Sequence, residues 1–182
     1  QKELNNQYDP KISTGEYGDN DSNDEFFWAA CELYNSTQTN IYLLEIKSRK
    51  PKTFKAPVWG EVGSMGIMSW LTYWSNNPRP RTPEITEIFD YGKQMLVKWA
   101  DEYINGVDKT IYLSPFGNKK EDFHWASMAE GAATEAIILA QAFNLTKEKK
   151  YRVNARRNAD YIFGRNATGY CFVTGFGDKS PM

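Results

Sequence analysis

Residues 158–182 read NADYIFGRNATGYCFVTGFGDKSPM, and they carry more structural information than any other part of the chain. A helical pattern runs to Gly164, and a loop rich in glycine and aromatic residues follows it. Four glycines between positions 164 and 177 allow backbone conformations that other residues resist. We therefore expect this loop to form a shaped surface, because loops held by a rigid scaffold often carry function.

The chain before this loop reads as a series of helices separated by glycine, proline and asparagine, without the alternation typical of strands. Thr82 is a good N-cap, with Pro83 at the first helical position where a missing amide costs nothing. Ser22 and Glu25 have the spacing of a capping box. The sequence predicts six helices, over residues 22–38, 39–48, 61–75, 83–103, 125–143 and 146–164.

Two segments of the chain resemble a known family. Residues 160–166 (DYIFGRN) and 170–177 (YCFVTGFG) match almost position for position the pattern Asp-Tyr-Ile-Leu-Gly-Arg-Asn and Tyr-Ser-Phe-Val-Thr-Gly-Phe-Gly of glycoside hydrolase family nine, the inverting cellulases. Residues 15–34, which include GEYGD and SNDEFFWAA, are a second close match. The resemblance implies an all-α fold, an α/α toroid of six helical hairpins. Residues 1–182 would be a partial catalytic domain, truncated at both ends, that supplies about half of the toroid.

The resemblance also implies a reaction, the hydrolysis of β-1,4-glucosidic bonds. An inverting glycosidase needs two carboxyl groups, about 6.5–9.5 Å apart, on opposite sides of the scissile bond. Family nine carries them in an Asp-Ala-Gly-Asp motif and an Asn-Glu motif, and neither motif occurs in this sequence. We therefore expect a fragment of a secreted inverting endo-β-1,4-glucanase (cellulase) that lacks both catalytic carboxylates. The alternative is a non-catalytic helical carbohydrate-binding or structural piece that another chain completes.

Three aromatic residues are candidates for contact with a β-glucan substrate. Trp125, in the sequence HWAS, resembles a family tryptophan at the head of a helix, where the indole stacks on a glucosyl ring. Trp59 and Tyr17 align more loosely with loops beside the groove. An aromatic plane complements the C–H groups on the flat face of a pyranose and excludes water from it. The alternative for Trp125 is a core residue at the end of a helix.

A structural calcium ion is the one cofactor that the resemblance implies. In several family members an Asp-Glu pair at the start of a helix binds calcium together with loop oxygens. The matching residues are Asp24 and Glu25, with Asp21 or Asn20 as the loop donor. Carboxylates and carbonyls are suitable ligands for calcium. The alternative is that Asp24 and Glu25 only stabilise the helix start through its dipole and the capping box.

Composition excludes several other classes of protein. The net charge of −1, from 22 basic and 23 acidic residues, creates no field that attracts nucleic acid or an anionic membrane. No apolar run is long enough to cross a membrane. Cys31 and Cys171 lack the spacing of a metal site and are interpreted as free thiols that behave as small apolar residues.

Overall fold

The computed structural model describes residues 21–181, and this part of the chain is built of helices. The α-helices are α1 (Asn23–Thr37), α2 (Asn40–Arg49), α3 (Gly63–Asn76), α4 (Pro83–Tyr103), α5 (Thr134–Thr146) and α6 (Lys149–Ile162). Three short helices, η1 (Val107–Lys109), η2 (Lys120–Asp122) and η3 (Ser127–Ala133), lie between α4 and α5. Residues 21–181 contain no strand, only one isolated antiparallel bridge between Val58 and Glu61. None of these helices is long and apolar enough to cross a membrane.

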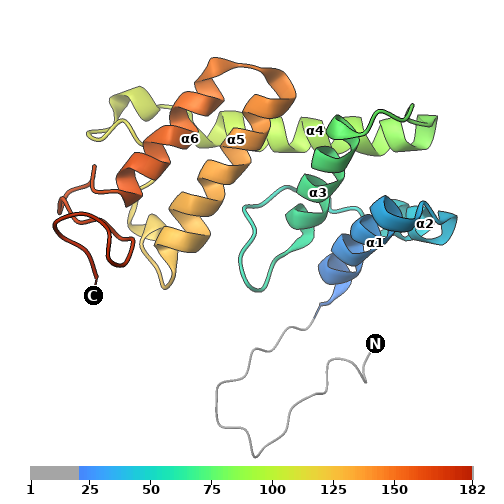
Figure 1. Cartoon of the computed structure of the whole chain (residues 1–182), viewed down its shortest axis with the longest axis horizontal. Helices are drawn as coiled ribbons and strands as arrows, with labels where there is room; N and C mark the ends of the chain where they lie inside the picture. Colours follow the sequence, from blue (N-terminus) through green and yellow to red (C-terminus); the bar gives the residue numbers. More distant parts are fainter. Residues whose placement is uncertain (1–20, 182) are drawn as a thin grey trace, which may run out of the picture.

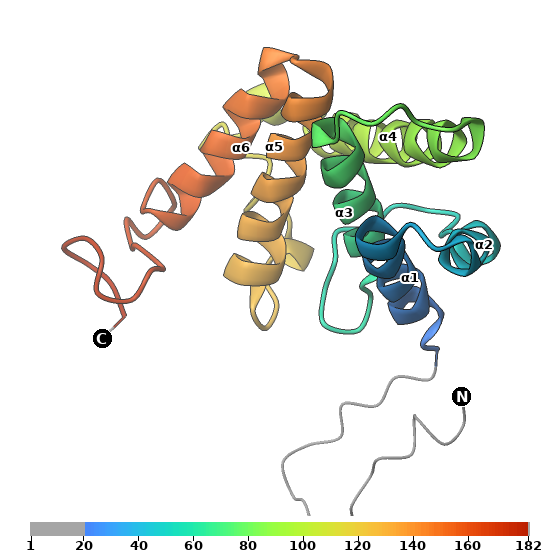
Figure 2. The ribbon, with the colours of Figure 1, turned by 45° about the vertical axis from the view of Figure 1, so that its right-hand side comes forward.

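The helices follow one another in three pairs, α1–α2, α3–α4 and α5–α6 (Figure 1). Helix α1 packs on α3, α3 packs on α5, and α4 crosses behind α3 and α5. The starts of α1, α3 and α5 point to one rim, which is the lower edge of Figures 1 and 2. Loop 50–62, helix η3 and loop 163–181 lie along the same edge in both views. The predicted all-α architecture, with its chemically rich loops on one rim, is confirmed.

Aromatic packing between α1 and α3 forms the centre of the core. Trp70 on α3 is 1 % exposed, and its ring lies 5.5 Å from that of Tyr34 and 5.8 Å from that of Trp74. Large buried rings contribute strongly to stability because each removes much apolar area from water. The close approach of the two helices depends on Gly66, where a Cβ atom would lie 2.7 Å from the ring of Phe27.

Both cysteines are free and buried, as the sequence predicted. Burial raises the pKa of the Cys31 thiol far above its usual range, so this group stays protonated. A buried protonated thiol is chemically inert and packs as a small apolar side chain.

The predicted cap of α4 is confirmed by the structure, and the predicted capping box of α1 is not. Thr82 caps α4 as expected, with its Oγ1 accepting a hydrogen bond from the Ile85 amide at 3.4 Å. The predicted capping box of Ser22 and Glu25 is wrong, because the Ser22 side chain makes no cap hydrogen bond. Its backbone, at φ −90° and ψ 19°, is not in the extended conformation that an N-cap needs.

The helix predicted from residue 125 begins with an irregular segment. Helix η3 is a π-helix, and α5 continues from it without a break. Its wide turns bring Gly131 against the ring of Phe116, where a Cβ atom would lie 2.7 Å from a ring carbon. A π-helix is rare and is often found at functional sites. The position of this π-helix therefore makes the loop that precedes it a candidate functional site.

Candidate functional site

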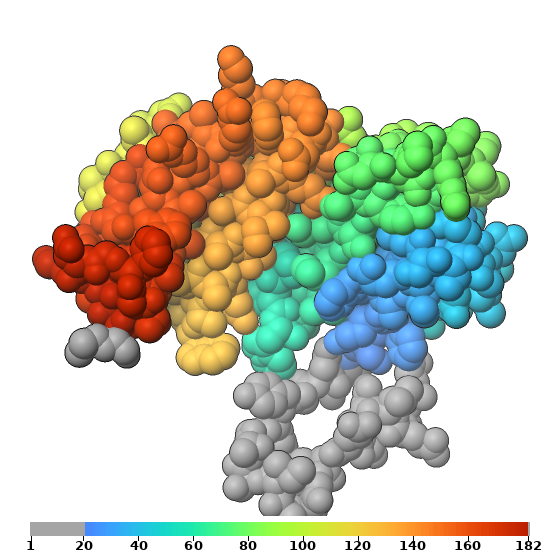
Figure 3. All heavy atoms as spheres, viewed as in Figure 1, coloured from blue at the N-terminus to red at the C-terminus, as the bar shows by residue number. Residues whose placement is uncertain are grey.

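A hollow of about 700 Å³ opens on the face where α1, α3 and α5 lie side by side, which Figure 3 views from the front. All three helices line it, through residues that include Trp28, Glu32, Met65, Thr72, Ile137 and Gln141. Gln141 fixes α5 to α3, because its Nε2 donates to the Met68 carbonyl oxygen at 2.7 Å and to Thr72 Oγ1 at 3.0 Å. This side of the three helices is concave and largely apolar, and it is called the inner face of α1, α3 and α5 below.

Trp125 lies at the end of the long loop between α4 and α5, and 80 % of its surface is exposed. The chain turns sharply after it, because Ala126 adopts the left-handed conformation at φ 62°. The Nδ1 atom of His124 lies 2.7 Å from the Trp125 carbonyl oxygen and closes this turn. The indole is therefore held away from the core of the described structure. It offers a free aromatic surface at the rim, as a sugar-stacking residue requires.

Trp59 occupies a second loop of the same rim, with 59 % of its surface exposed. It sits in a tight turn closed by two backbone hydrogen bonds of 3.1 Å between Val58 and Glu61. Two of the three predicted substrate-binding residues, Trp125 and Trp59, are thus exposed on loops. The third, Tyr17, lies outside the described residues.

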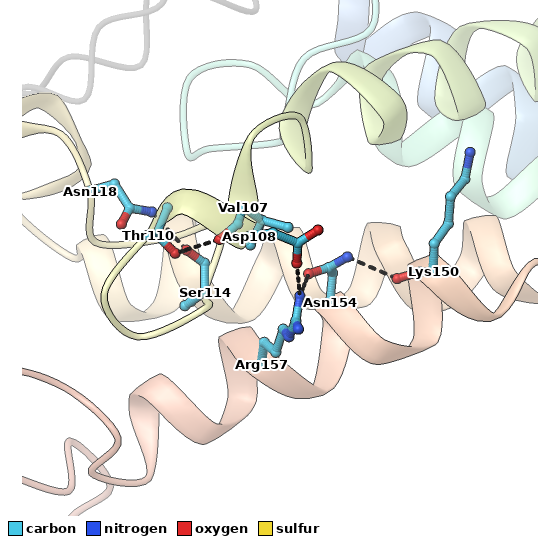
Figure 4. A network of polar contacts seen from close by, with 8 residues as sticks. All are labelled: Val107, Asp108, Thr110, Ser114, Asn118, Lys150, Asn154 and Arg157. Atoms are coloured by element: carbon cyan, nitrogen blue, oxygen red, sulfur yellow. Dashed lines mark hydrogen bonds and ion pairs between the residues drawn. The ribbon is translucent and has the colours of Figure 1, made fainter.

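The loop that carries Trp125 is fixed by hydrogen bonds along its length. The Oδ2 atom of Asp122 accepts from the amides of Gly117, Asn118 and Lys119 at 2.8–3.0 Å. The Asn118 side chain donates to the Ser114 carbonyl oxygen at 2.7 Å, and Thr110 Oγ1 reaches the same oxygen at 3.3 Å (Figure 4). The loop therefore has a defined shape although it contains little regular helix.

Glu135 forms an acidic site beside this loop that the sequence pattern did not single out. Its Oε2 accepts a short hydrogen bond from the Tyr103 hydroxyl. Burial raises the pKa of Glu135 to about 7 and outweighs the hydrogen bond from Tyr103, which favours the charged form. The negative charge of Asp122 adds to this rise, and His124 and Lys119 oppose it. A glutamic acid that titrates near neutrality therefore lies close to the base of the Trp125 loop.

The residues predicted to bind calcium lie at the start of α1. Asp21 and Asp24 line one hollow of about 210 Å³, together with Arg49 and Glu61. The Oδ2 atom of Asp24 accepts from the Val62 amide at 2.7 Å. Although partial burial acts to raise it, this bond and one from Glu25 hold the pKa of Asp24 below its usual value, so Asp24 stays charged.

The described residues alone do not complete a calcium site there. In residues 21–181 no group of three or more His, Cys, Asp or Glu side chains converges as a metal would require. Two cations lie at this hollow, because Lys55 Nζ pairs with Glu61 Oε2 at 2.8 Å and Arg49 is one of the lining residues. The loop donor expected from Asn20 lies outside the described residues.

Comparison with known proteins identifies the family. The sequence model of Glycosyl hydrolase family 9 matches residues 1–182. The chain belongs to glycosyl hydrolase family 9. A xyloglucan-specific endo-β-1,4-glucanase of Bacteroides ovatus is 45% identical over 179 residues, which are 98% of this chain and 30% of that protein. Endoglucanase C of Cellulomonas fimi is 28% identical over 169 residues, which are 90% of this chain and 14% of that protein.

Solved structures of family 9 confirm the architecture. A Bacteroides ovatus GH9 structure superimposes with a TM-score of 0.89 at 44% identity, over 100% of this chain and 32% of that one. A thermostable endoglucanase from Alicyclobacillus acidocaldarius gives 0.76 at 27% identity, over 95% and 32%. The chain thus spans at most about a third of the length of the relatives it matches. The predictions of a partial family 9 domain and of a toroid of helical hairpins are confirmed.

Proposed function

We propose that this family 9 segment is part of the catalytic domain of an inverting endo-β-1,4-glucanase, called the parent enzyme below. The observation that carries this proposal is the exposed Trp125 on the rim of a family 9 helical scaffold. In that enzyme the segment binds and orients the polysaccharide, and the two catalytic carboxyl groups come from other parts of the domain. The inner face of α1, α3 and α5 packs there against the remaining helices of the toroid.

The substrate class follows from the geometry of the rim and from the relatives. Exposed indoles on a rim suit a chain of pyranose rings, because each flat sugar face covers one aromatic plane. The Bacteroides ovatus relative is named as xyloglucan-specific and Endoglucanase C as an endoglucanase. We propose a β-1,4-linked glucan, and xyloglucan is the first polymer to test. We also propose that the parent enzyme is secreted, because such polymers are too large to enter a cell; measuring glucanase activity in medium and cell fractions tests this.

Changing Trp125→Ala in the parent enzyme should raise the Michaelis constant for a soluble β-1,4-gluco-oligosaccharide by about tenfold. A tenfold change is about 1.4 kcal/mol, which is in the range for one well-packed ring contact. The catalytic rate constant should change little, because the ring contacts the sugar equally before and during the reaction.

Steady-state kinetics on purified enzyme measures this effect. The matched control is Ile111→Ala, since Ile111 is an apolar residue of the same loop and is 89 % exposed. An unchanged Michaelis constant for Trp125→Ala, or an equal rise for the control, would show that Trp125 does not bind sugar.

We further propose a structural calcium ion at the start of α1 in the parent enzyme. What supports it is the pair Asp21 and Asp24 beside one hollow, with Glu25 next to them on the first turn. Oxygens of the loop before residue 21, with Asn20 as the donor expected from the sequence, would complete the shell of ligands at about 2.3–2.6 Å from the ion. The ion would attach the preceding loop to α1.

Removal of calcium should therefore lower the melting temperature of the parent enzyme by a few degrees, because a bound ion stabilises only the folded state. Scanning calorimetry with a chelator, and again after calcium is restored, measures this shift. The variant Asp24→Asn should melt at the same temperature with and without the chelator. If the chelator leaves the melting temperature of the parent enzyme unchanged as well, Asp24 and Glu25 only stabilise the helix start.

A further inference from the structure

We infer that Asn158 on α6 is a positioning residue for the loop that carries Trp125, and that it sets the affinity of the sugar subsite at that indole. The inference rests on the proposed function of Trp125 and adds a buried residue that touches no sugar. Four elements meet at its side chain: the Trp125 loop, η3, α4 and α6 itself.

The amide of Asn158 is fully buried and uses all four of its hydrogen-bonding positions. Its Oδ1 accepts from Ser114 Oγ at 3.1 Å and from the Phe116 amide at 3.2 Å. Its Nδ2 donates to the Tyr103 hydroxyl at 2.9 Å and to the Ala132 carbonyl oxygen at 3.3 Å. A buried amide whose partners are lost must either stay unpaired or move, and both outcomes disturb its surroundings.

From this amide a chain of ring contacts leads to the indole. The Phe116 ring is buried and meets the Phe123 ring edge to face, with 5.8 Å between their centroids. The Phe116 ring also meets the ring of Tyr161 on α6, with 5.3 Å between their centroids. Phe123 precedes Trp125 by only two residues. The position of the Phe116 backbone, which Asn158 fixes, therefore limits where Trp125 can lie.

The same amide also fixes the other side of Trp125. Helix η3 begins two residues after the indole, and its Ala132 carbonyl oxygen accepts from Asn158. Tyr103, the third partner of Asn158, donates to Glu135 on the first turn of α5. The segment that contains Trp125 is thus attached to one side chain before and after the indole. Such preorganisation raises affinity, because binding then orders less of the loop.

Helix α6 offers a matched control in Asn154, one turn before Asn158. Asn154 is 4 % exposed and Asn158 0 %, and both are asparagines of the same helix. The Asn154 side chain donates to the Lys150 carbonyl oxygen at 3.0 Å and accepts from Arg157 at 3.1 Å, both on α6 (Figure 4). Replacement of either asparagine removes buried hydrogen bonds, but only one of the two residues bonds the loop directly.

The test is a double-mutant cycle in the parent enzyme with cellohexaose as substrate. Asn158→Ala should raise the Michaelis constant about tenfold and leave the catalytic rate constant within about twofold. In the Trp125→Ala background the same change should add less than about twofold, because the subsite is already lost. Asn154→Ala should lower the melting temperature as Asn158→Ala does, yet leave the Michaelis constant within about twofold in both backgrounds.

Four results would overturn the inference. Additive effects of Asn158→Ala and Trp125→Ala would show that the asparagine does not act through the indole. An equal rise of the Michaelis constant for Asn154→Ala would show that the effect of Asn158→Ala comes from general destabilisation. If Trp125→Ala leaves the Michaelis constant unchanged, the proposed role of Trp125 is overturned as well. If Trp125→Ala raises the Michaelis constant as expected but Asn158→Ala does not, only the positioning role is overturned. If Asn158→Ala does not fold, Ser114→Ala removes one of its bonds and should show a smaller, equally non-additive rise.

Discussion

Purified alone, the 182-residue chain should not hydrolyse carboxymethyl-cellulose above a buffer control. The reason is chemical, because the sequence contains neither the Asp-Ala-Gly-Asp motif of the catalytic base nor the Asn-Glu motif of the acid. General acid–base catalysis contributes about 10²–10⁴-fold for each group, so the loss of both costs about 10⁴-fold or more. The hollow between α1, α3 and α5 would also be exposed to solvent, and the isolated chain should tend to associate.

A reducing-sugar assay at equal molar concentrations, with the parent enzyme as the positive control, measures this loss of activity. Circular dichroism on the same sample shows whether the helices have formed, so that an unfolded chain is recognised as such. Turnover that survives a second purification would place the catalytic carboxyl groups inside this segment. Glu16, Asp19 and Glu130 would then be the first residues to replace, and of these only Glu130 lies in the described structure.

The sequence predicted the helices well because their signals are local. Proline and asparagine between 76 and 81 end α3, and Thr82 with Pro83 starts α4 where the pattern placed it. The capping box failed for a reason that spacing cannot show, since the Ser22 backbone is not extended. The π-helix was also missed, because periodicity does not distinguish its wide turns from α-helix; it packs Gly131 against Phe116, 15 residues earlier in the sequence.

The candidate site, like the fold, could be predicted from the sequence only in part. Family resemblance located Trp125 and Trp59 on loops, and the structure shows both of them exposed. The side chains behind the Trp125 loop left no signal in the sequence, because Tyr103 and Asn158 are 55 positions apart and meet only in the folded chain. An asparagine in an amphipathic helix is normally interpreted as an ordinary surface residue, and the role of Asn158 appears only when its four partners are known.

Glu135 should make the stability of the parent enzyme fall as the pH rises from about 5 to 8. Burial raises the pKa of this group from 4.5 to about 7, so the folded protein holds a proton that the unfolded chain has released. For a raised pKa the stabilising contribution is complete below 4.5 and is lost as the pH rises through 7. A shift of this size corresponds to a loss on the order of 3 kcal/mol in the free energy of unfolding between low and high pH.

Urea unfolding of the parent enzyme at several pH values between 5 and 8 measures this dependence, and Glu135→Gln should flatten it. Glutamine keeps an oxygen that accepts from Tyr103 and carries no charge, so it imitates the protonated acid at every pH. The variant should therefore match the parent enzyme at pH 5 and exceed its stability at pH 8. Glu130→Gln removes the same charge from the neighbouring π-helix and should leave the slope unchanged. Parallel curves for the parent enzyme and Glu135→Gln would show that this carboxyl group is not the source of the pH dependence, whereas a flattened curve for the variant would identify it as the source.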